Sequence, residues 1–324
     1  MNLLCKRCES EDFFMGSGPT IGVVTVTYNS GGVIDEFMMS ILKQTYADFI
    51  LYIVDNASPD DTLRRLAEYR DDRIVPIPNE VNTGVAEGNN IGIRAALKDG
   101  CGFVLLINND TVFEPNLISK LTDGLREHKC DMVVPKILFF DDPTKIWCAG
   151  GYFNALRGTG SHFGLGRKDD GRFDLARAVG YSPTCCMLIK REVFDRVGLM
   201  DSSYFLYFDD TDFCLRAYRS GVKLWYLSSA RLRHKVSSLT GGTSIVTIRY
   251  ITRNHVYYML KHYPRWQIVL YCSMLYVYIL GKYLFLSRRP KLFWAAQKAF
   301  WEGIFLFVSN LERSKRALEP TGVL

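Results

Sequence analysis

Five side chains in this sequence are of types, and at positions, that could do chemistry. Asp110 closes an apolar run, Asp209, Asp210 and Asp212 form an acidic cluster, and His234 follows them. An isolated carboxylate among side-chain oxygens suits a hard divalent cation that keeps water and phosphate oxygens as its other ligands. A histidine adds a nitrogen ligand, which Mn2+ accepts more readily than Mg2+. An aspartate in the first turn of a helix is held ionised by the helix dipole and can act as a base.

Each of these residues also has a purely structural interpretation. Asp209 and Asp210 are typical helix-capping residues. Asp212 is expected on the helix surface or in an ion pair with Arg216, four residues later. A lone histidine such as His234 is most often a satisfied structural residue. The residue types alone leave both interpretations open.

The elements that must position these residues alternate between strands and helices in the first third of the chain. Short apolar, β-branched runs predict strands, and apolar residues every three or four positions predict helices. The expected strands are residues 21–27, 49–54, 73–77 and 103–107, and the expected helices are residues 32–44, 60–69 and 85–98. Strands that are apolar throughout and alternate with helices predict an α/β fold with a mostly parallel sheet covered on both faces.

Polar residues follow these strands. In parallel α/β sheets, ligands bind beyond the carboxyl ends of the strands. Turns favour Asp and Asn in any protein, but their repeated presence at strand ends predicts one polar rim. The rim is expected to contain Thr27, Tyr28, Asn29, Asp55, Asn82, Gly84, Asn89, Asn108, Asn109 and Asp110.

The second half of the chain has α+β character. The expected strands are residues 131–137, 146–153, 184–189 and 222–227, and the expected helices are residues 191–197 and 209–218. Residues 157–180 are rich in Gly, Arg and Asp. This composition predicts a mobile loop over the site.

Seven segments, in this order along the chain, resemble the motifs of inverting family 2 glycosyltransferases of the GT-A fold. They are VTVTYNS (24–30), IVDNAS (53–58), NTGVAEGNNIG (82–92), LLINNDT (105–111), CMLIKREVF (186–194), FLYFDDTDFCLR (205–216) and RH (233–234). Within the family, the chain most resembles bacterial rhamnosyltransferase-like enzymes of polysaccharide assembly. The resemblance implies a GT-A (nucleotide-diphospho-sugar transferase) fold with a mostly parallel central sheet, followed here by a C-terminal helical appendage.

The resemblance assigns the polar rim to a nucleotide-sugar donor. Thr27, Tyr28 and Asn29 would wrap the base and the ribose. Asp55 would accept a hydrogen bond from N3–H of a pyrimidine, which favours a UDP- or dTDP-sugar. The residues that would hold the ribose and diphosphate region are Asn82, Gly84, Asn89 and Asn109.

The same resemblance gives roles to the acidic residues. Residues 108–110 stand where the family has its Asp-x-Asp metal motif, and only Asp110 is acidic here. Asp110 and His234 would contact Mg2+ or Mn2+. Asp210 matches the general base, and Asp209 would shape the acceptor pocket. Inverting transfer needs these two functions, because a base must face the attacking hydroxyl while the leaving diphosphate gains negative charge.

The implied function is transfer of a sugar, with inversion, from a UDP- or dTDP-sugar such as dTDP-rhamnose to a hydroxyl of a glycan or lipid-linked acceptor in cell-surface polysaccharide synthesis. A nucleotidyltransferase is one alternative, but the segment TYNSGG (27–32) lacks the basic residue of a phosphate-binding loop. A catalytically inactive scaffold subunit that binds sugar nucleotides is another, suggested by the reduced metal motif. The presence of Asp110, Asp210 and His234 together argues against it.

The charge of the 324-residue chain is unevenly distributed. Residues 249–324 hold 12 Lys and Arg against 3 Asp and Glu, a net charge of +9, whereas the whole chain carries +6. A slightly acidic body with a basic, aromatic tail excludes a uniformly basic nucleic-acid binder. The tail is expected to attach the protein, as a peripheral or monotopic protein, to the anionic cytoplasmic face of the inner or plasma membrane.

Two segments of the tail are candidates for this attachment. Residues 266–287 are largely apolar and, at about 1.5 Å per residue, long enough to cross a ~30 Å hydrocarbon layer. Residues 292–308 contain Lys298 and Glu302 and fit a helix that lies in the interface. The alternative is a helical pair that packs on the catalytic domain or on a dimer partner. The predicted organisation is a polar leader (1–20), a catalytic domain (21–248, with halves 21–111 and 112–248) and a membrane-associating helical region (249–324).

The nine cysteines are an odd number and are scattered along the chain. Cys185, Cys186 and Cys214 lie in apolar runs, which predicts reduced core thiols and a cytosolic location. Cys5 and Cys8 are a lone pair without a second pair at metal-ligand spacing, so a leader without metal is favoured over a zinc or redox site. The first residues lack the pattern of a secretory signal.

Overall fold

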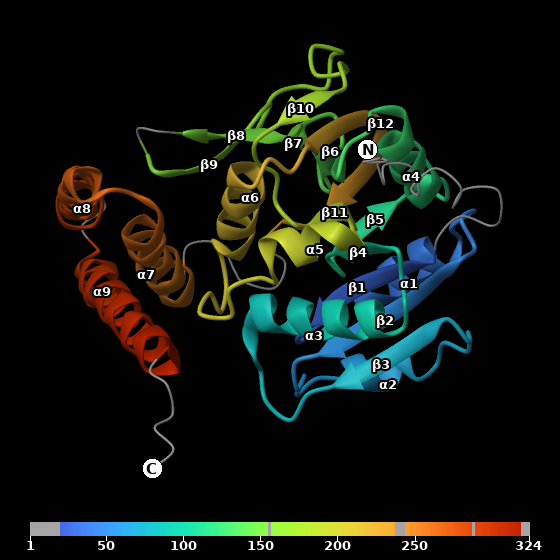
Figure 1. Cartoon of the computed structure of the whole chain (residues 1–324), viewed down its shortest axis with the longest axis horizontal. Coiled ribbons are helices and arrows are strands. Elements are labelled where there is room, and N and C mark those ends of the chain that lie inside the picture. Colours follow the sequence, from blue (N-terminus) through green and yellow to red (C-terminus); the bar gives the residue numbers. More distant parts are fainter. Residues whose placement is uncertain (1–19, 155–156, 237–243, 287–288, 319–324) are drawn as a thin grey trace, which may run out of the picture.

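The computed structural model describes residues 20–154, 157–236, 244–286 and 289–318 (Figure 1). Its first part alternates between strands and helices as predicted. The elements are β1 (Ile21–Thr27), α1 (Ile34–Leu42), β2 (Phe49–Asp55), α2 (Thr62–Leu66), β3 (Ile74–Pro78), α3 (Gly84–Lys98) and β4 (Phe103–Ile107). Only α2 is clearly shorter than the helix expected at residues 60–69. The leader, with Cys5 and Cys8, lies outside the described residues.

The second part of the sheet domain follows the prediction less closely. Its elements are β5 (Thr111–Phe113), α4 (Leu117–Glu127), β6 (Met132–Phe139), β7 (Ile146–Cys148), β8 (Gly151–Asn154), β9 (Thr159–His162), β10 (Arg177–Val179), β11 (Cys186–Lys190), α5 (Arg191–Val197), α6 (Asp209–Arg219) and β12 (Leu224–His234). The strand expected at residues 146–153 is divided into β7 and β8, and Gly150 between them has a φ of 72°. The strand expected at residues 222–227 continues as β12 to His234.

The strands form one mixed sheet in the order β10-β12-β6-β11-β4-β1-β2-β3. The four N-terminal strands are parallel to one another. β11 runs antiparallel to both of its neighbours, β4 and β6. The short strand β5 leaves the main order and pairs with the end of β12. The carboxyl ends of β1, β2 and β4 therefore face the same edge of the sheet.

Both faces of the sheet are buried around β1 and β4, which explains why these strands are largely apolar. Val24 of β1 and Leu106 of β4 belong to a core on one face of the sheet. Their neighbours Val23 and Leu105 belong to a second core on the other face. Successive residues of a strand point to opposite faces, so a strand covered on both sides needs apolar residues at every position. On the first face, α3 packs closely against β1 because Gly22 and Gly92 have no side chain. A Cβ at either position would collide with the opposite element.

The segment at residues 157–180, expected to be a mobile loop, contains two strands in the structure. β9 forms a hairpin with β8, and β10 adds to the edge of the sheet beside β12. Between them, Asp169 and Asp174 form ion pairs with Lys136, whose side chain is completely buried in β6. A buried lysine needs an anionic partner. The sequence pattern did not show this anchor because its residues are far apart in the chain.

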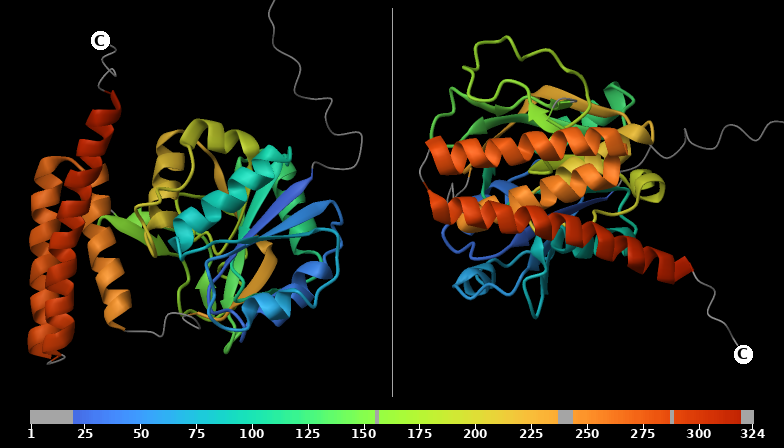
Figure 2. Two further views of the ribbon diagram at one scale, coloured as in Figure 1. Left: turned by 90° about the horizontal axis from the view of Figure 1, so that it is seen from below. Right: turned by 90° about the vertical axis from the view of Figure 1, so that its left-hand side faces the viewer.

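Three long elements follow the sheet domain and lie together along one face of it (Figure 2). They are α7 (Ile245–His262), α8 (Arg265–Ile279), continued by a π-helical segment at Leu280–Leu286, and α9 (Pro290–Leu318). The boundary predicted at residue 248 falls inside α7. Of the helices in the described part of the chain, none combines the length and apolar character needed to cross a bilayer.

The cysteine prediction can be compared with the structure for the described residues. Cys185, Cys186 and Cys214 are buried and free, as expected for core thiols. Burial raises the pKa of each of these thiols well above its ordinary value. They are therefore protonated at neutral pH and unreactive.

Candidate active site

A cavity of about 1130 Å³ lies beyond the carboxyl ends of the strands. Its lining comes from the rim of the sheet, from β9, from the segment before α6 and from α7. Of the twelve predicted site residues, nine line this cavity. They are Tyr28, Asn82, Gly84, Asn89, Asn109, Asp110, Asp209, Asp210 and His234.

Asp110 and His234 form a pair at the rim. The imidazole Nε2 of His234 lies 3.1 Å from Oδ1 of Asp110, and both side chains are largely buried. The pairing of β5 with β12 brings them together, because Thr111 lies opposite His234 in this ladder. The ring of His234 also packs edge-on against Trp147, with 4.6 Å between the ring centroids.

This pair suits a divalent cation. A carboxylate oxygen and an imidazole nitrogen are both ligands that Mn2+ accepts, and Mg2+ accepts the carboxylate. Within the described residues, no group of three or more His, Cys, Asp or Glu side chains is placed to hold an ion. The donor set therefore fits an ion that receives only two ligands from the protein and the rest from a diphosphate and water.

The predicted nucleotide residues are ordered by local hydrogen bonds. The amide of Asn109 donates to the carbonyl of Val26 at 2.5 Å, which ties the end of β4 to the end of β1. Oδ1 of Asn82 accepts a hydrogen bond from the backbone N–H of Gly84 at the start of α3. Gly84 has a φ of 81°, a conformation that glycine adopts without strain. Tyr28 lines the cavity and is 41% exposed.

Thr27, Asn29 and Asp55 are not among the residues that line the cavity. Asp55 is buried, and its carboxylate accepts hydrogen bonds from the hydroxyls of Thr27 (2.7 Å) and Ser58 (2.6 Å). Ser58 also accepts a hydrogen bond from the backbone N–H of Asn29. In this conformation, Asp55 organises the two loops that follow β1 and β2.

The acidic pair lies at the first turn of α6. Asp209 is buried, and Asp210 is partly exposed to the cavity. Three groups donate hydrogen bonds to Asp210: the Tyr181 hydroxyl at 3.2 Å and the backbone N–H and hydroxyl of Thr211 at 2.6 and 3.1 Å. These donors fix the direction in which the Asp210 carboxylate points.

Burial and mutual repulsion act on both carboxylates. Burial raises the pKa of Asp209, and the neighbouring Asp210 charge raises it further. Burial also raises the pKa of Asp210, while the hydrogen bonds from Thr211 oppose this rise. Burial keeps Tyr181 protonated, because its pKa lies well above the ordinary value. Asp210 is therefore the better-solvated member of the pair and has a raised proton affinity, which suits a base.

One sequence interpretation placed Asp212 on the helix surface, but the residue is buried. Its side chain is completely buried between α6 and α7, and the expected ion pair with Arg216 is present at 2.7 Å. Lys261 and His262 of α7 contact the same carboxylate at 2.7 and 2.6 Å. The nearby cations and hydrogen bonds outweigh the effect of burial and lower the pKa of Asp212. This residue joins two helices and does not face the cavity.

Several residues that line the cavity were not singled out from the sequence. Trp147 and His162 come from β7 and β9, and Tyr181 precedes β11. Nδ1 of His162 donates a hydrogen bond to the carbonyl of Trp147 (3.1 Å), and the ring stacks on Tyr181. The C-terminal helices contribute Tyr250, His255 and Tyr278. The C-terminal region therefore forms part of the cavity wall, which its basic and aromatic composition had not indicated.

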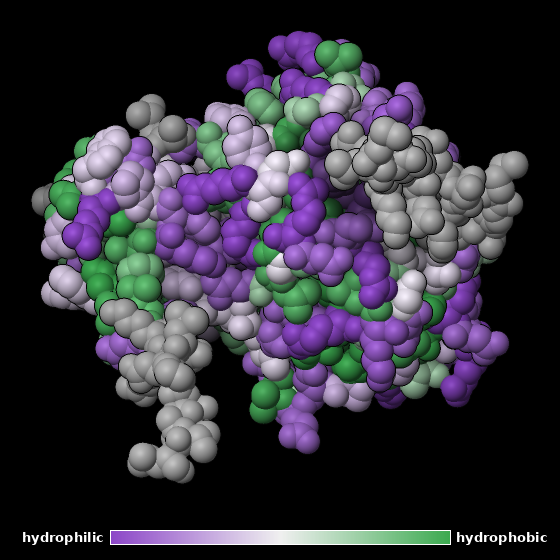
Figure 3. All heavy atoms as spheres, viewed as in Figure 1, coloured by the Kyte–Doolittle hydropathy of each residue, from purple (hydrophilic) through white to green (hydrophobic). Residues whose placement is uncertain are grey.

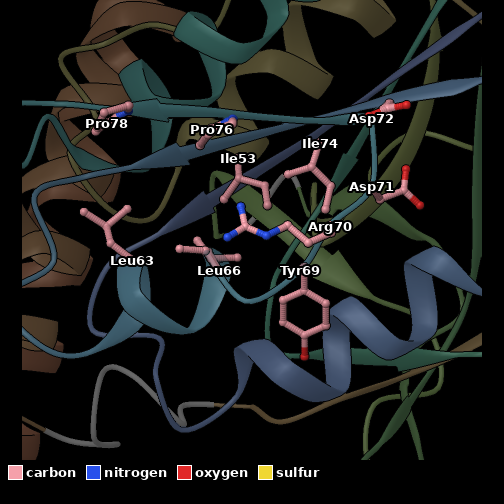
Figure 4. A pocket seen from close by; sticks show the side chains of 11 residues that line it. Ile53, Leu63, Leu66, Tyr69, Arg70, Asp71, Asp72, Ile74, Pro76 and Pro78 are labelled. Carbon is pink, nitrogen blue, oxygen red and sulfur yellow. The ribbon is translucent and has the colours of Figure 1, made fainter.

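A second cavity, of about 1090 Å³, lies at the β3 edge of the sheet, between α2 and strands β2 and β3 (Figure 4). Its lining is mainly apolar; Asp71 and Asp72 lie at one end, and the Arg70 side chain reaches toward Ile53 and Leu66 (Figure 4). The Asp71 carboxylate is already paired with Arg73. None of the predicted site residues lines this cavity, so the chemistry is expected at the first one.

Comparison with known proteins identifies the family. A family model described as glycosyl transferase family 2 matches residues 22–198, which is more than half of the chain. The chain belongs to glycosyl transferase family 2. The motif resemblance that suggested this family is thereby confirmed, and so is the expected α/β fold of the GT-A type with its C-terminal helices.

Two relatives of this family 2 glycosyltransferase are named rhamnosyltransferases. N-acetylglucosaminyl-diphospho-decaprenol L-rhamnosyltransferase of Mycobacterium tuberculosis (strain ATCC 25618 / H37Rv) is 25% identical over 238 residues, covering 68% of this chain and 77% of the relative. The dTDP-rhamnosyl transferase RfbF of Shigella flexneri is 24% identical over 216 residues, covering 67% and 69%.

Two solved structures share the fold. S. aureus TarS in complex with UDP has a TM-score of 0.54 and 16% identity, with 94% of both chains covered. GalNAc-T7 with UDP, GalNAc and Mn2+ has a TM-score of 0.63 and 17% identity. That match covers 80% of this chain but only 51% of GalNAc-T7, so this chain spans about half the length of that protein. At such identities, the likeness concerns the fold alone.

Proposed function

We propose that this glycosyltransferase moves a sugar from a UDP- or dTDP-sugar, with dTDP-rhamnose as the first candidate, to a hydroxyl of a glycan or lipid-linked acceptor in cell-surface polysaccharide synthesis. The observation that carries the proposal is that one cavity is lined both by the Asp110–His234 pair at the sheet rim and by the Asp209–Asp210 pair at the start of α6. The rhamnosyltransferase names of two relatives favour the donor.

The presence of the Asp110–His234 pair and the Asp209–Asp210 pair in one cavity supports inverting transfer. The acceptor hydroxyl attacks C1 of the donor sugar from the side opposite the diphosphate. A new C1–O bond forms as the bond between C1 and the diphosphate oxygen breaks, and the hydroxyl proton passes to Asp210. A divalent cation on Asp110 and His234 would neutralise charge on the departing diphosphate. Tyr181 and Thr211 hold the Asp210 carboxylate in place for the proton transfer.

Replacing Asp210 by asparagine tests the proposed base. D210N keeps the size of the side chain and removes its basicity, so turnover should fall by at least about 10²-fold. Binding of UDP and dTDP, measured by calorimetry, should stay within about threefold of the wild type. D195N, at an exposed position of α5, is the matched control and should keep full turnover.

The donor is tested with a panel of UDP- and dTDP-sugars, each with Mg2+ or Mn2+, by release of the nucleoside diphosphate.

Turnover of D210N equal to that of the wild type would remove Asp210 as the base. An inactive scaffold subunit would bind nucleotide without release of nucleoside diphosphate from any donor. A nucleotidyltransferase would release pyrophosphate from a nucleoside triphosphate.

The C-terminal helices support a second part of the proposal, peripheral attachment to the anionic cytoplasmic face of the inner or plasma membrane. Hydrophobic residues are exposed on the lobe that these helices form (Figure 3). Trp294, Trp301 and Phe305 of α9 are 68, 63 and 73% exposed. Lys291 and Lys298 of the same helix are exposed too. Exposed aromatic residues beside lysines are typical of a helix that lies in the headgroup region of an anionic bilayer.

Vesicle sedimentation tests this attachment. The protein should bind vesicles that contain phosphatidylglycerol more strongly than vesicles of phosphatidylcholine, and high salt should weaken the binding. The double variant W294S/W301S should lose most of it. L175S is the control, because Leu175 is 77% exposed on the sheet domain, away from these helices. Equal binding by W294S/W301S and the wild type would refute the role of α9.

A further inference from the structure

The turn before the acidic pair has an unusual backbone. Tyr207 and Phe208 have φ values of 66° and 68°, so two consecutive residues with large side chains adopt the left-handed conformation. Residues other than glycine rarely adopt it, because Cβ crowds the backbone. Such a turn persists only where surrounding groups hold it. Asp209 follows immediately, so the conformation of this turn sets the start of α6.

Backbone carbonyl groups of this turn are held from two sides. The carbonyl of Phe205 accepts a hydrogen bond from the backbone N–H of Val85 in α3, at 2.8 Å. The next two carbonyls, of Leu206 and Tyr207, accept hydrogen bonds at 2.7 and 2.8 Å from one side-chain amide, Nδ2 of Asn254. Both acceptors are carbonyl oxygens, so both amide hydrogens of Asn254 are used as donors.

Asn254 is itself firmly placed. It is completely buried in α7. Its Oδ1 accepts a hydrogen bond from Nε of Arg253 at 2.7 Å, and the guanidinium of Arg253 donates to the carbonyl of Ser203 at 3.0 Å. The orientation of the amide is thereby fixed from both ends. On later turns of α7, Tyr257 and Lys261 contact Asp201, so the same face of the helix follows the segment from residue 201 to residue 212.

We propose that Asn254 is a positioning residue for the transfer reaction, and that through it α7 belongs to the catalytic apparatus although it lies outside residues 22–198. The inference rests on the proposed function, because it assumes that Asp210 is the base. Asn254 does not touch the cavity; it acts through the carbonyls of Leu206 and Tyr207. Without its two donors, these carbonyls lose their partners and the turn relaxes toward right-handed φ values, which rotates the first turn of α6.

The variant N254D tests this role. Aspartate has the shape of asparagine but no amide hydrogens, so it faces two carbonyl oxygens with an acceptor. The rate constant kcat for nucleoside diphosphate release, with the best donor of the panel, should fall by about 100-fold, the effect of misplacing a reacting group by about 1 Å. The Kd of UDP and dTDP should stay within threefold, because the nucleotide half is unchanged.

Asn310 of α9 provides a matched control. It also donates two hydrogen bonds through one amide, at 2.8 Å to the hydroxyl of Ser203 and 2.9 Å to that of Tyr257. The hydroxyl of Ser203 can turn and donate to an aspartate, while that of Tyr257 keeps its hydrogen bond to Asp201. N310D should therefore keep kcat within threefold of the wild type. Equal losses of kcat in N254D and N310D would overturn the proposal in favour of a general loosening of the C-terminal helices.

Hydrogen exchange gives a readout that does not depend on activity. Backbone amides of residues 205–212 should exchange at least tenfold faster in N254D than in N310D or the wild type. A folded N254D with wild-type kcat and exchange, alongside an inactive D210N, would overturn the inference and leave the proposed function standing. Full turnover in D210N would instead overturn the proposed base, whereas the exchange result would still decide whether Asn254 holds the turn. If N254D does not fold, N254A, which removes the donors without adding a charge, replaces it in both measurements.

Discussion

Asp212 carries a buried negative charge between α6 and α7, and replacing it by asparagine should destabilise the protein strongly at neutral pH. Its carboxylate lies 2.7 Å from both Arg216 and Lys261 and 2.6 Å from His262. D212N removes this charge and leaves two cations facing a neutral amide. Breaking a buried ion pair by removing one partner costs about 3–5 kcal/mol.

The structure places the expected loss at the lower end of this range. The side chains of Arg216 and Lys261 keep 22 and 25% of their exposure, so water still solvates them in part. Lys261 also keeps its ion pair with Asp201 at 2.6 Å. We therefore expect the free energy of unfolding to fall by about 3 kcal/mol, which for a chain of 324 residues corresponds to a decrease in Tm of about 4–5 °C.

The pH dependence of this loss is a sharper test. The pKa of Asp212 is lowered in the folded protein, so its stabilising contribution is present above the unfolded-state pKa of about 3.9 and is lost as the pH falls below it. Urea unfolding of the wild type and D212N at pH 7, 5, 4 and 3 should show a difference that is constant from pH 7 to 5 and then shrinks. D195N is the control and should cost less than about 0.5 kcal/mol. A difference between wild type and D212N that is below 1 kcal/mol at pH 7, or that grows on acidification, would refute the reasoning.

Three further predictions concern the cavity. Chelation of divalent cations should abolish transfer. D110N should raise the Mn2+ concentration needed for half-maximal turnover at least tenfold, because one of the two proposed protein ligands is lost. An unchanged metal requirement in D110N would exclude Asp110 as a ligand. Burial raises the pKa of Asp210, so kcat should rise with pH through a midpoint above the ordinary carboxylate range of about 4. A midpoint at or below 4 would contradict this. In G84A, the new Cβ would lie 2.5 Å from the carbonyl oxygen of Phe205 at a φ of 81°. We expect thermal unfolding of G84A to show that the free energy of unfolding falls by about 1–3 kcal/mol, and calorimetry to show weaker UDP or dTDP binding. Wild-type values in both measurements would show that the start of α3 accommodates the added Cβ.

The N-terminal strands could be predicted closely because their sequence signal is local. β1 and β4 have the predicted bounds, since strands buried on both faces are apolar at each position and end where polar residues begin. The polar rim was predictable for the same reason, because the residues after parallel strands meet at one edge. The order of motifs along the chain identified the family.

The rest of the site depends on contacts between residues far apart in the chain. Nothing local to His234 indicates that β12 pairs with β5 and delivers it to Asp110. The polar residues of α7, including Asn254, gave no signal of burial, because their partners lie in the segment before α6. Asp212 had the spacing of a surface ion pair with Arg216, and only the docking of α7 buries it. Interactions of this kind are set by tertiary packing, which the periodicity of one segment does not encode.

The ladder between β5 and β12 has a consequence for biosynthesis on the ribosome. Chains fold from the N-terminus as they emerge, so the nucleotide half, with β1 to β4, is complete long before His234 has been synthesised. Until β12 docks and α7 follows, a nascent chain has the loops proposed to bind the donor but neither the Asp110–His234 pair nor the support beneath the acidic turn. The order of elements along the chain thus makes turnover, as proposed above, depend on segments that are synthesised after the nucleotide half.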